Sequence, residues 1–396
     1  MACPPMVWQV VNPGSVHGMA PHGHAMACPY KCPAAETAAL PEELRQPVIS
    51  PILWALDAWK KPVRRLTPLI GAVILLCAVV FPLASQDDPC TQRSFLVTVI
   101  DREGHPVPGL TAANFRGKFR GKPVQIESAV FDTGPRRMVI VLDISGSMMR
   151  GNESKVARLL ALDAVQMNRD DSPLALTAFA TSVIASIGFD RGNLELSDRL
   201  VALLSEKSIT PRNQGITALY DALDAAVGLL TPAQPGDIVY ALTDGIDTAS
   251  HVKASQVEKA LVERGVRLFA AVPAGNLGHL YRGSMEGFQR LRQMVQATGG
   301  GQLSLFSVSR YSAVYWWNED QKAALLSLAT ILYQQMRMTY RIKVQLSSDL
   351  DKPREWDLEF VNYQNQRRDD WMVLCPRKLL PCSQTTAAPS AHGAIK

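Results

Sequence analysis

The chain has 396 residues, of which 47% are hydrophobic and 19% carry a charge. This length allows two or three domains and this composition allows a sizeable core, which disfavours bulk disorder. The net charge of +5 is spread along the sequence, which disfavours a nucleic-acid-binding protein because such proteins usually gather basic residues on one face. Seven cysteines in a chain of this length also exclude a small disulfide-dense scaffold.

An uncharged apolar segment divides the chain at residues 66–86. It is long enough to cross a bilayer as a helix. Basic residues stand directly before it and acidic residues directly after it, namely Lys60, Lys61, Arg64, Arg65, Asp87 and Asp88. The positive-inside rule therefore predicts a cytoplasmic N-terminus and an extracytoplasmic location, in the cell envelope, for everything that follows. Two interpretations of residues 60–86 stay open, a single transmembrane anchor and a signal peptide whose cleavage releases a secreted protein.

Three cysteines precede this segment, Cys77 lies inside it, and three follow it. Residues 1–59 are rich in Pro, Ala, His and Met and are predicted to form a disordered tail. The spacing CPYKC in this tail has no second cysteine pair, so we interpret its His and Cys residues as incidental. Beyond the segment only Cys90, Cys375 and Cys382 remain. A disulfide between two of them would fit an extracytoplasmic location, but the sequence does not choose the pair.

Two separate segments have the pattern of β structure. Residues 90–132 contain the runs SFLVTVID and QIESAVFD, which are rich in β-branched and aromatic residues and are separated by Gly and Pro. Residues 320–375 carry a helical pattern followed by the strands TYRIKVQL and REWDLEFV. We expect both segments to pair into one small β unit that flanks the domain between them. Residues 376–396, rich in Pro, Ser, Thr and Ala, are predicted to form a second disordered tail.

Residues 136–310 alternate strands with helices. The expected strands are RRMVIVLD, LALTAFA, SVIASIGF, DIVYALTD, VRLFAAVP and GQLSLFSV, and the expected helices span residues 153–168, 217–230, 254–264 and 287–297. Apolar strands that alternate with helices of this length predict an α/β fold, a doubly wound and mostly parallel sheet covered on both faces. In such folds, ligands bind beyond the carboxyl ends of the strands.

Five oxygen-bearing residues are predicted to gather at that edge of the sheet. Asp143, Ser145 and Ser147 follow the first strand, Thr217 opens a helix, and Asp244 ends the strand DIVYALTD. Such hard oxygen ligands favour Mg²⁺, Mn²⁺ or Ca²⁺, and no Cys or His is nearby in sequence to favour zinc. A cation held largely by neutral hydroxyl groups stays electrophilic. It would therefore accept a carboxylate from a partner as its missing ligand.

This constellation closely resembles the metal-ion-dependent adhesion site of von Willebrand factor A-type domains. The residues DISGS match the DxSxS motif, Thr217 matches the threonine of the site, and Asp244 matches the aspartate of its TDG turn. The resemblance implies that Ser145, Ser147 and Thr217 are direct ligands. It also implies that Asp143 and Asp244 hold waters or coordinate in an alternative state. The nearby Asp247 is interpreted as a surface residue.

The resemblance covers residues 94–346. The segment before the α/β domain is similar to the leader of bacterial secreted or membrane proteins related to von Willebrand factor A, through Asp101, Gly104, Val107, Leu110, Thr111 and Phe115. The ATGG turn at 297–300 also matches that family. The aromatic stretch at 311–317 departs from the pattern, and it would form either a patch for a partner or packing under the tail.

Enzyme interpretations find little support. There is no G-x-x-x-x-G-K-[ST] loop and no G-x-S-x-G elbow. No histidine beyond the membrane segment falls in a motif, although a hydrolase that uses the metal to activate water stays open. We therefore predict an extracytoplasmic protein-binding module that is not an enzyme and captures an Asp or Glu carboxylate of a partner. The alternative is a structural subunit of an envelope assembly in which the metal only stabilises the fold.

Overall fold

The structure is a computed structural model that describes residues 90–148, 153–168, 172–203, 216–273, 282–305, 319–362, 364–368 and 370–382. All of them fall within one of the two compact units into which the chain divides. The predicted N-terminal tail, the predicted membrane segment and the aromatic stretch at 311–317 lie outside the described residues. Among the helices that are described, none is both long and apolar enough to cross a membrane.

The centre of the α/β domain is a six-stranded sheet with the order β6-β5-β4-β7-β8-β9. Its strands are β4 (Met138–Asp143), β5 (Leu174–Phe179), β6 (Val183–Ile187), β7 (Ile238–Leu242), β8 (Arg267–Val272) and β9 (Gln302–Ser304). All neighbouring strands pair in parallel except β6, which is antiparallel to β5 at one edge. Strands β4, β5, β7 and β8 are buried along their whole length. This is why their sequences are apolar at nearly every position rather than at every second one.

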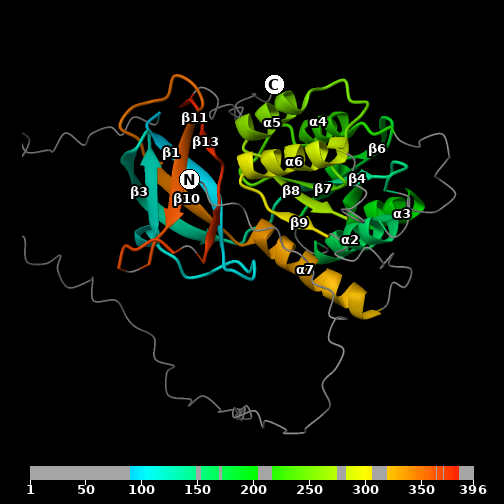
Figure 1. The fold of residues 1–396 in the computed structure, drawn as a ribbon, viewed down its shortest axis with the longest axis horizontal. Helices are drawn as coiled ribbons and strands as arrows, with labels where there is room; N and C mark the ends of the chain where they lie inside the picture. Colours follow the sequence, from blue (N-terminus) through cyan, green and yellow to red (C-terminus); the bar gives the residue numbers. More distant parts are fainter. Residues whose placement is uncertain are drawn as a thin grey trace, which may run out of the picture. The chain divides into compact units, whose positions relative to one another are not determined.

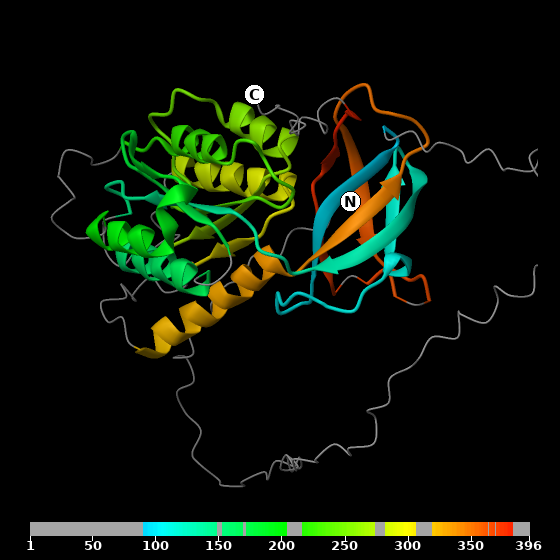
Figure 2. The same cartoon turned by 180° about the vertical axis from the view of Figure 1, so that it is seen from behind.

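Helices cover both faces of this sheet (Figures 1 and 2). They are α2 (Glu153–Met167), α3 (Gly192–Leu203), α4 (Leu219–Leu229), α5 (Ala254–Glu263), α6 (Arg282–Ala297) and α7 (Glu319–Arg337), with short 3₁₀ turns η1 (Ala112–Asn114) and η2 (Phe189–Arg191). Helices α2, α3 and α7 pack into one apolar cluster against one face of the sheet, and α4, α5 and α6 pack into a second cluster against the other. The predicted doubly wound α/β fold is confirmed.

Helix α3 is an element that the sequence analysis missed. Its apolar positions do not form one stripe, because Leu196 and Leu200 are fully buried while Leu194 and Val201 are exposed. A helix that buries only two leucines one turn apart gives a weak periodic signal in the sequence.

A second sheet of seven strands is built from segments before and after the α/β domain. Its order is β12-β1-β10-β3-β2-β11-β13, and all of its pairs are antiparallel. The strands are β1 (Gln92–Ile100), β2 (Phe115–Phe119), β3 (Lys122–Asp132), β10 (Thr339–Gln345), β11 (Arg354–Phe360), β12 (Met372–Leu374) and β13 (Lys378–Leu379). Strand β10 lies between β1 and β3, as expected for a β unit assembled from both sides of the domain.

The two outer strands of this sheet are neighbours in the sequence. Only three residues, 375–377, separate β12 at one edge from β13 at the other. The Trp356 side chain donates a hydrogen bond from Nε1 to the carbonyl oxygen of Pro376 at 2.8 Å, which anchors this link. Residues 376–382 were expected in a disordered tail. Residues 378–382 instead include β13 and the half-cystine Cys382. Strand β12 pairs with β1 at 98–100, and β13 pairs with β11 at 354–355.

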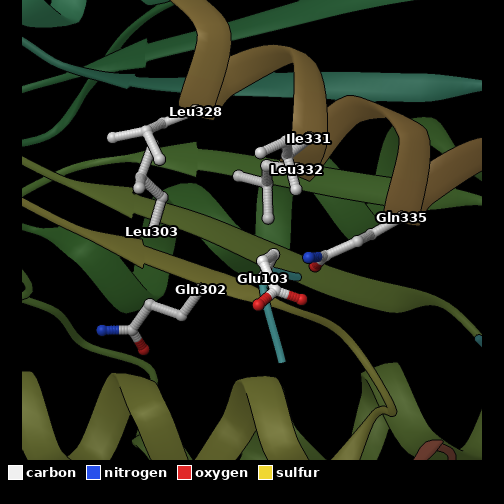
Figure 3. Close-up of a pocket in the computed structure, with 7 residues that line it drawn as sticks. All are labelled: Glu103, Gln302, Leu303, Leu328, Ile331, Leu332 and Gln335. Carbon is white, nitrogen blue, oxygen red and sulfur yellow. The ribbon is translucent and has the colours of Figure 1, made fainter. Parts of the chain in front are cut away.

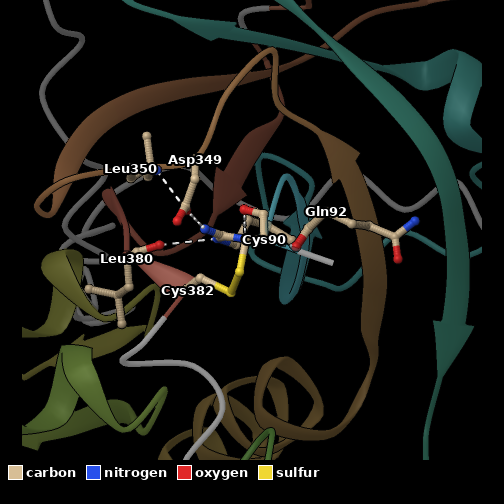
Figure 4. The surroundings of a disulfide bond; sticks show 7 residues. Cys90, Gln92, Asp349, Leu350, Leu380 and Cys382 are labelled. Atoms are coloured by element: carbon tan, nitrogen blue, oxygen red, sulfur yellow. Dashed lines mark hydrogen bonds and ion pairs between the residues drawn. A yellow bond between two sulfur atoms is a disulfide. The ribbon is translucent and has the colours of Figure 1, made fainter. Parts of the chain in front are cut away.

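The disulfide joins Cys90 to Cys382, with 5.1 Å between their Cα atoms, and Cys375 stays a free thiol. Figure 4 shows the surroundings of this disulfide. The guanidinium of Arg93 donates to the carbonyl oxygens of Cys90, Gln92 and Leu380 and pairs with Asp349. The structure thus settles the pairing that three cysteines in the sequence left open.

Two buried arginines lie where the parallel strands begin, which we call the amino edge of the sheet. Arg267 donates to the carbonyl oxygen of Gly299 through Nε at 3.1 Å and Nη2 at 2.8 Å, and to Thr98 Oγ1 on β1 at 3.0 Å. Arg136 donates to Thr339 Oγ1 on β10 at 3.0 Å and pairs with Asp132 at 3.1 Å. Burial and the charge of Arg136 lower the pKa of Arg267 to about 9. These contacts join the α/β domain to the β unit.

Candidate functional site

The predicted site begins where β4 and β7 end side by side, which we call the carboxyl edge of the sheet. Leu142 lies opposite Leu242 in the parallel register, so Asp143 and Thr243 are the next residues of the two strands. The Thr243 hydroxyl donates to Asp143 Oδ2 at 2.7 Å, and the backbone N–H of Ser145 donates to Asp143 Oδ1 at 2.9 Å. The orientation of the Asp143 carboxylate is therefore set by one neighbour on each strand.

Asp244 joins the same cluster through Ser147. The two hydroxyl oxygens of Ser145 and Ser147 lie 3.1 Å apart, and the Ser147 side chain is hydrogen-bonded to the Asp244 carboxylate. Asp244 also accepts the backbone N–H of Ile246 at 3.0 Å. Four of the five predicted residues are thus linked by hydrogen bonds.

Thr217 reaches this edge through its backbone. The N–H of Ala218, the next residue, donates to the carbonyl oxygen of Ala180 at 2.8 Å. Ala180 directly follows β5, whose last residue Phe179 lies opposite Asp143. The Thr217 side chain is buried, with 2% of the residue exposed. In the described part of the chain, no hydrogen bond joins its hydroxyl to the other four residues, so Thr217 is placed at this edge by its backbone.

The two carboxylates of this cluster both have raised pKa values. Burial, followed by the nearby charge of Asp244, raises the pKa of Asp143 to about 7, against the lowering effect of its bonds from Ser145 and Thr243. Burial also raises the pKa of Asp244. Among the described residues, no basic side chain forms an ion pair with either carboxylate. Two buried acids that lack a cation are an unfavourable arrangement unless a positive charge is supplied.

The donor set fits a divalent cation with hard-ligand preferences. Carboxylate and hydroxyl oxygens suit Mg²⁺ or Mn²⁺, whereas zinc sites are usually built from Cys and His. Among the described residues, no group of three or more His, Cys, Asp or Glu gathers as a metal site. That finding is expected for a site whose donors are mostly Ser and Thr. These residues would hold the ion, and their role as ligands stays a prediction.

The turn that carries Asp244 depends on two glycines. Gly245 has a φ of 85°, a left-handed conformation that side chains other than glycine rarely adopt. Gly287 on α6 lies so close that a Cβ there would meet the Gly245 carbonyl oxygen at 2.5 Å. Helix α6 therefore packs directly against the turn and holds Asp244 at the end of β7.

Sequence reasoning missed three hydroxyl residues that support the predicted ligands. Thr243 bridges Asp143 and the backbone N–H of Gly245, which it accepts at 3.1 Å. Thr248 and Ser250 contact the segment around Thr217. Asp247, interpreted as a surface residue, is half-buried and accepts the N–H of Tyr220 at 3.3 Å. The only available signal was the concentration of Thr, Ser and Asp directly after a buried strand.

A pocket elsewhere in the α/β domain has a different character. It is lined by Glu103, Gln302, Leu303, Leu328, Ile331, Leu332 and Gln335, between β9, α7 and the loop after β1 (Figure 3). Its volume of about 20 Å³ is enough for a single water molecule. It contains none of the five predicted metal ligands.

The fold and its carboxyl edge define a class of α/β domain that gathers oxygen side chains at one end of a parallel sheet. Residues 138–246 match the family model of the von Willebrand factor type A domain, and the α/β part of this chain is a domain of that family. The match ends two residues after Asp244 and includes all five predicted ligands. The family that the sequence motifs indicated is thereby confirmed. Members of this family generally act as adhesion or interaction modules.

Solved structures of similar fold share little sequence with this chain. The human COPII-coat protein Sec24c is 11% identical, with 64% of this chain and 44% of that chain covered and a TM-score of 0.37. Proximal thread matrix protein 1 from the mussel byssus, solved with a zinc-occupied MIDAS motif, is 17% identical over 55% of this chain and 50% of its own, with a TM-score of 0.39. A von Willebrand factor type A protein from Catenulispora acidiphila is 13% identical over 72% of each chain, with a TM-score of 0.35.

The chain covers 44% of the length of the first of these proteins and 50% of the length of the second. At such scores the likenesses carry no argument about the function of this chain. No curated protein matches the sequence.

Proposed function

We propose that this protein is an extracytoplasmic binding module that captures a carboxylate of a partner protein through a divalent cation. Asp143, Ser145, Ser147, Thr217 and Asp244 would hold the ion, and an Asp or Glu of the partner would complete its coordination. The observation that carries this proposal is a pair of largely buried carboxylates that have no basic partner among the described residues. A bound Mg²⁺ or Mn²⁺ would neutralise both charges and leave a position open.

The residues of this site would have different roles in holding the ion. The hydroxyl groups of Ser145 and Ser147 already lie side by side and would face the ion directly, as the family resemblance implies. The carboxylates of Asp143 and Asp244 would orient metal-bound waters and supply the negative charge that retains the ion. Because the direct ligands are mostly neutral, the ion would keep enough positive charge to attract a carboxylate from outside.

The extracytoplasmic location has support from two independent features. The Cys90–Cys382 disulfide is typical of proteins that fold in an oxidising compartment. The charge pattern around residues 66–86 predicts the same side of the membrane for the described residues. The two interpretations of this segment, a membrane anchor and a cleaved signal peptide, both stay predictions.

The test is calorimetric titration of Mg²⁺ and Mn²⁺ into the purified chain and into an Asp143→Ala, Ser145→Ala double variant. We expect saturable one-site binding that the double variant lacks. Envelope proteins should then be captured in the presence of Mn²⁺ and released by chelator, and the double variant should capture none of them. A metal that raises the melting temperature while every interaction stays unchanged would favour the structural-subunit alternative. No binding at millimolar metal would contradict the proposal.

A further inference from the structure

The start of helix α4 has no cap of its own. Ala218 occupies the N-cap position and has no side-chain oxygen with which to accept a backbone N–H. The loop that follows Asp244 supplies the missing acceptor. Ser250 Oγ accepts the N–H of Tyr220 at 2.9 Å and of Asp221 at 3.1 Å. The first turn of the helix is therefore capped from a different segment of the chain, which we call the clasp loop, residues 247–252.

Helix α4 also supplies an acceptor to the clasp loop. The Asp221 carboxylate on α4 accepts the backbone N–H groups of His251 and Val252, each at 2.9 Å. Its second oxygen lies 3.0 Å from Nδ1 of His251, a residue whose side chain is 95% exposed. Helix and loop thus each satisfy backbone groups of the other, which makes the contact specific in register rather than a loose packing of surfaces.

Thr217 lies inside this reciprocal contact. Its backbone N–H donates to Thr248 Oγ1 at 2.8 Å, and its carbonyl oxygen accepts the N–H groups of Thr248 at 2.8 Å and of Ala249 at 3.0 Å. The peptide groups on both sides of Thr217 are therefore fixed by the clasp loop. Since backbone orientation determines where a side chain points, the loop also determines where the Thr217 hydroxyl is presented.

We infer that Thr248 is a positioning residue of the metal site, which it serves by holding Thr217. This inference rests on the metal-binding function proposed above. The clasp loop begins three residues after Asp244 and is hydrogen-bonded to Thr217. It therefore connects the Asp244 turn and the Thr217 segment into one half of the site. The DISGS turn is the other half of the site. It is joined to the first half by the hydrogen bonds of Thr243 to Asp143 and of Ser147 to Asp244. The site would thus have two halves whose spacing sets the affinity for the ion.

The test compares Thr248→Val, which keeps the shape but removes the hydroxyl acceptor, with Thr248→Ser, which restores the acceptor. Thr330→Val is the matched control, because the Thr330 hydroxyl bonds only within its own helix α7, to the Leu326 carbonyl oxygen at 2.8 Å. The dissociation constant for Mn²⁺ is measured by calorimetry at a temperature where circular dichroism shows each variant to be fully folded. A merely structural role would not change the affinity of fully folded protein.

We expect Thr248→Val to weaken Mn²⁺ binding by about tenfold, the usual lower bound for loss of a group that orients a metal ligand. Thr248→Ser should stay within about threefold of wild type, and Thr330→Val should equal wild type. Wild-type affinity in folded Thr248→Val would overturn the inference and leave the proposed function standing. A wild-type chain that binds no Mn²⁺ would overturn both. If Thr248→Val does not fold, Thr248→Ala is measured against the same criterion.

Discussion

The two ends of the parallel sheet bury charges of opposite sign. At the amino edge, the guanidinium groups of Arg136 and Arg267 are almost fully buried, and at the carboxyl edge the carboxylates of Asp143 and Asp244 are largely so. The partners of the two pairs differ. The arginines meet carbonyl oxygens, two threonine hydroxyls and Asp132. Within the described residues, the aspartates contact only hydroxyl and N–H groups.

This difference separates a structural site from a binding site. A buried charge that donates hydrogen bonds to several segments holds these segments together. Arg136 and Arg267 do this although one nitrogen of each guanidinium, Arg136 Nε and Arg267 Nη1, has no hydrogen-bond partner among the described residues. A buried pair of like charges that has hydrogen bonds but no counter-charge keeps a raised pKa and favours any species that brings positive charge. The amino edge therefore ties the α/β domain to the β unit, while the carboxyl edge is suited to bind a cation. The following changes test this contrast.

Replacing Arg267 with methionine should have the largest effect on stability. The variant would leave the Gly299 carbonyl oxygen and the Thr98 hydroxyl without their donor. We expect a loss of about 4 kcal/mol in the free energy of unfolding, since hydrogen bonds to charged groups contribute roughly 1.5–3 kcal/mol each. Urea denaturation measures it. The exposed Arg158 on α2 offers a matched control, and Arg158→Met should stay within about 0.5 kcal/mol of wild type. Equal losses in both variants would show that the amino edge is not a structural site.

Removing the disulfide should lower the free energy of unfolding and leave the metal affinity nearly unchanged. We expect Cys90→Ser to lower the free energy of unfolding by about 3 kcal/mol, within the usual range for loss of a native disulfide. The affinity for Mn²⁺ should change little, because Cys90 belongs to the turn before β1 and not to the α/β domain. Denaturation and calorimetry on the same sample give both values. A large loss of metal affinity would contradict the separation of the two regions.

Neutralising Asp143 should stabilise the metal-free protein. The pKa of this group is raised from 3.8 to about 7, so between these values the folded state holds a proton that the unfolded state has lost. The contribution of Asp143 to stability is therefore zero below pH 4, becomes unfavourable as the pH rises through this window, and is fully unfavourable above pH 7. With EDTA at pH 8, we expect Asp143→Asn to be more stable than wild type by on the order of 2 kcal/mol.

The gain should disappear at pH 4, where wild type carries the proton, and it should reverse when Mn²⁺ is added, because only wild type is stabilised by the ion. Thermal unfolding at the two pH values, with and without metal, provides the comparison. An Asn variant less stable than wild type in EDTA at pH 8 would show that the carboxylate is not strained.

The smallest expected effect is that of Ser250→Ala. Loss of the hydroxyl that caps α4 should lower the free energy of unfolding by about 1 kcal/mol, as is typical when a capping serine is removed. Urea denaturation in EDTA measures this directly. Ser128→Ala on β3 serves as the control, and a cost for Ser250→Ala no greater than for that control would indicate that the clasp loop does not cap the helix.

The sequence was sufficient to predict the α/β fold and the proximity of four oxygen residues at one edge of the sheet, Asp143, Ser145, Ser147 and Asp244. Residues 138–142 are apolar at every position, and a strand followed by a helix in strict alternation allows few arrangements besides a parallel sheet. The carboxyl ends of such strands meet at one edge whatever the details of packing. Helix α3 was missed because only two of its leucines are buried, and the binding role of the five residues stays a prediction.

Tertiary structure alone decided the features that depend on contacts between distant segments. The pairing of Cys90 with Cys382, the link that joins both edges of the seven-stranded sheet, and the cap that Ser250 gives to α4 have no local period in the sequence. The pKa of Asp143 is likewise a property of its surroundings, because the residue type sets only the ordinary value and burial beside Asp244 shifts it. Local patterns determine which elements form and in what order they run, whereas charge, capping and covalent closure depend on which elements meet in space.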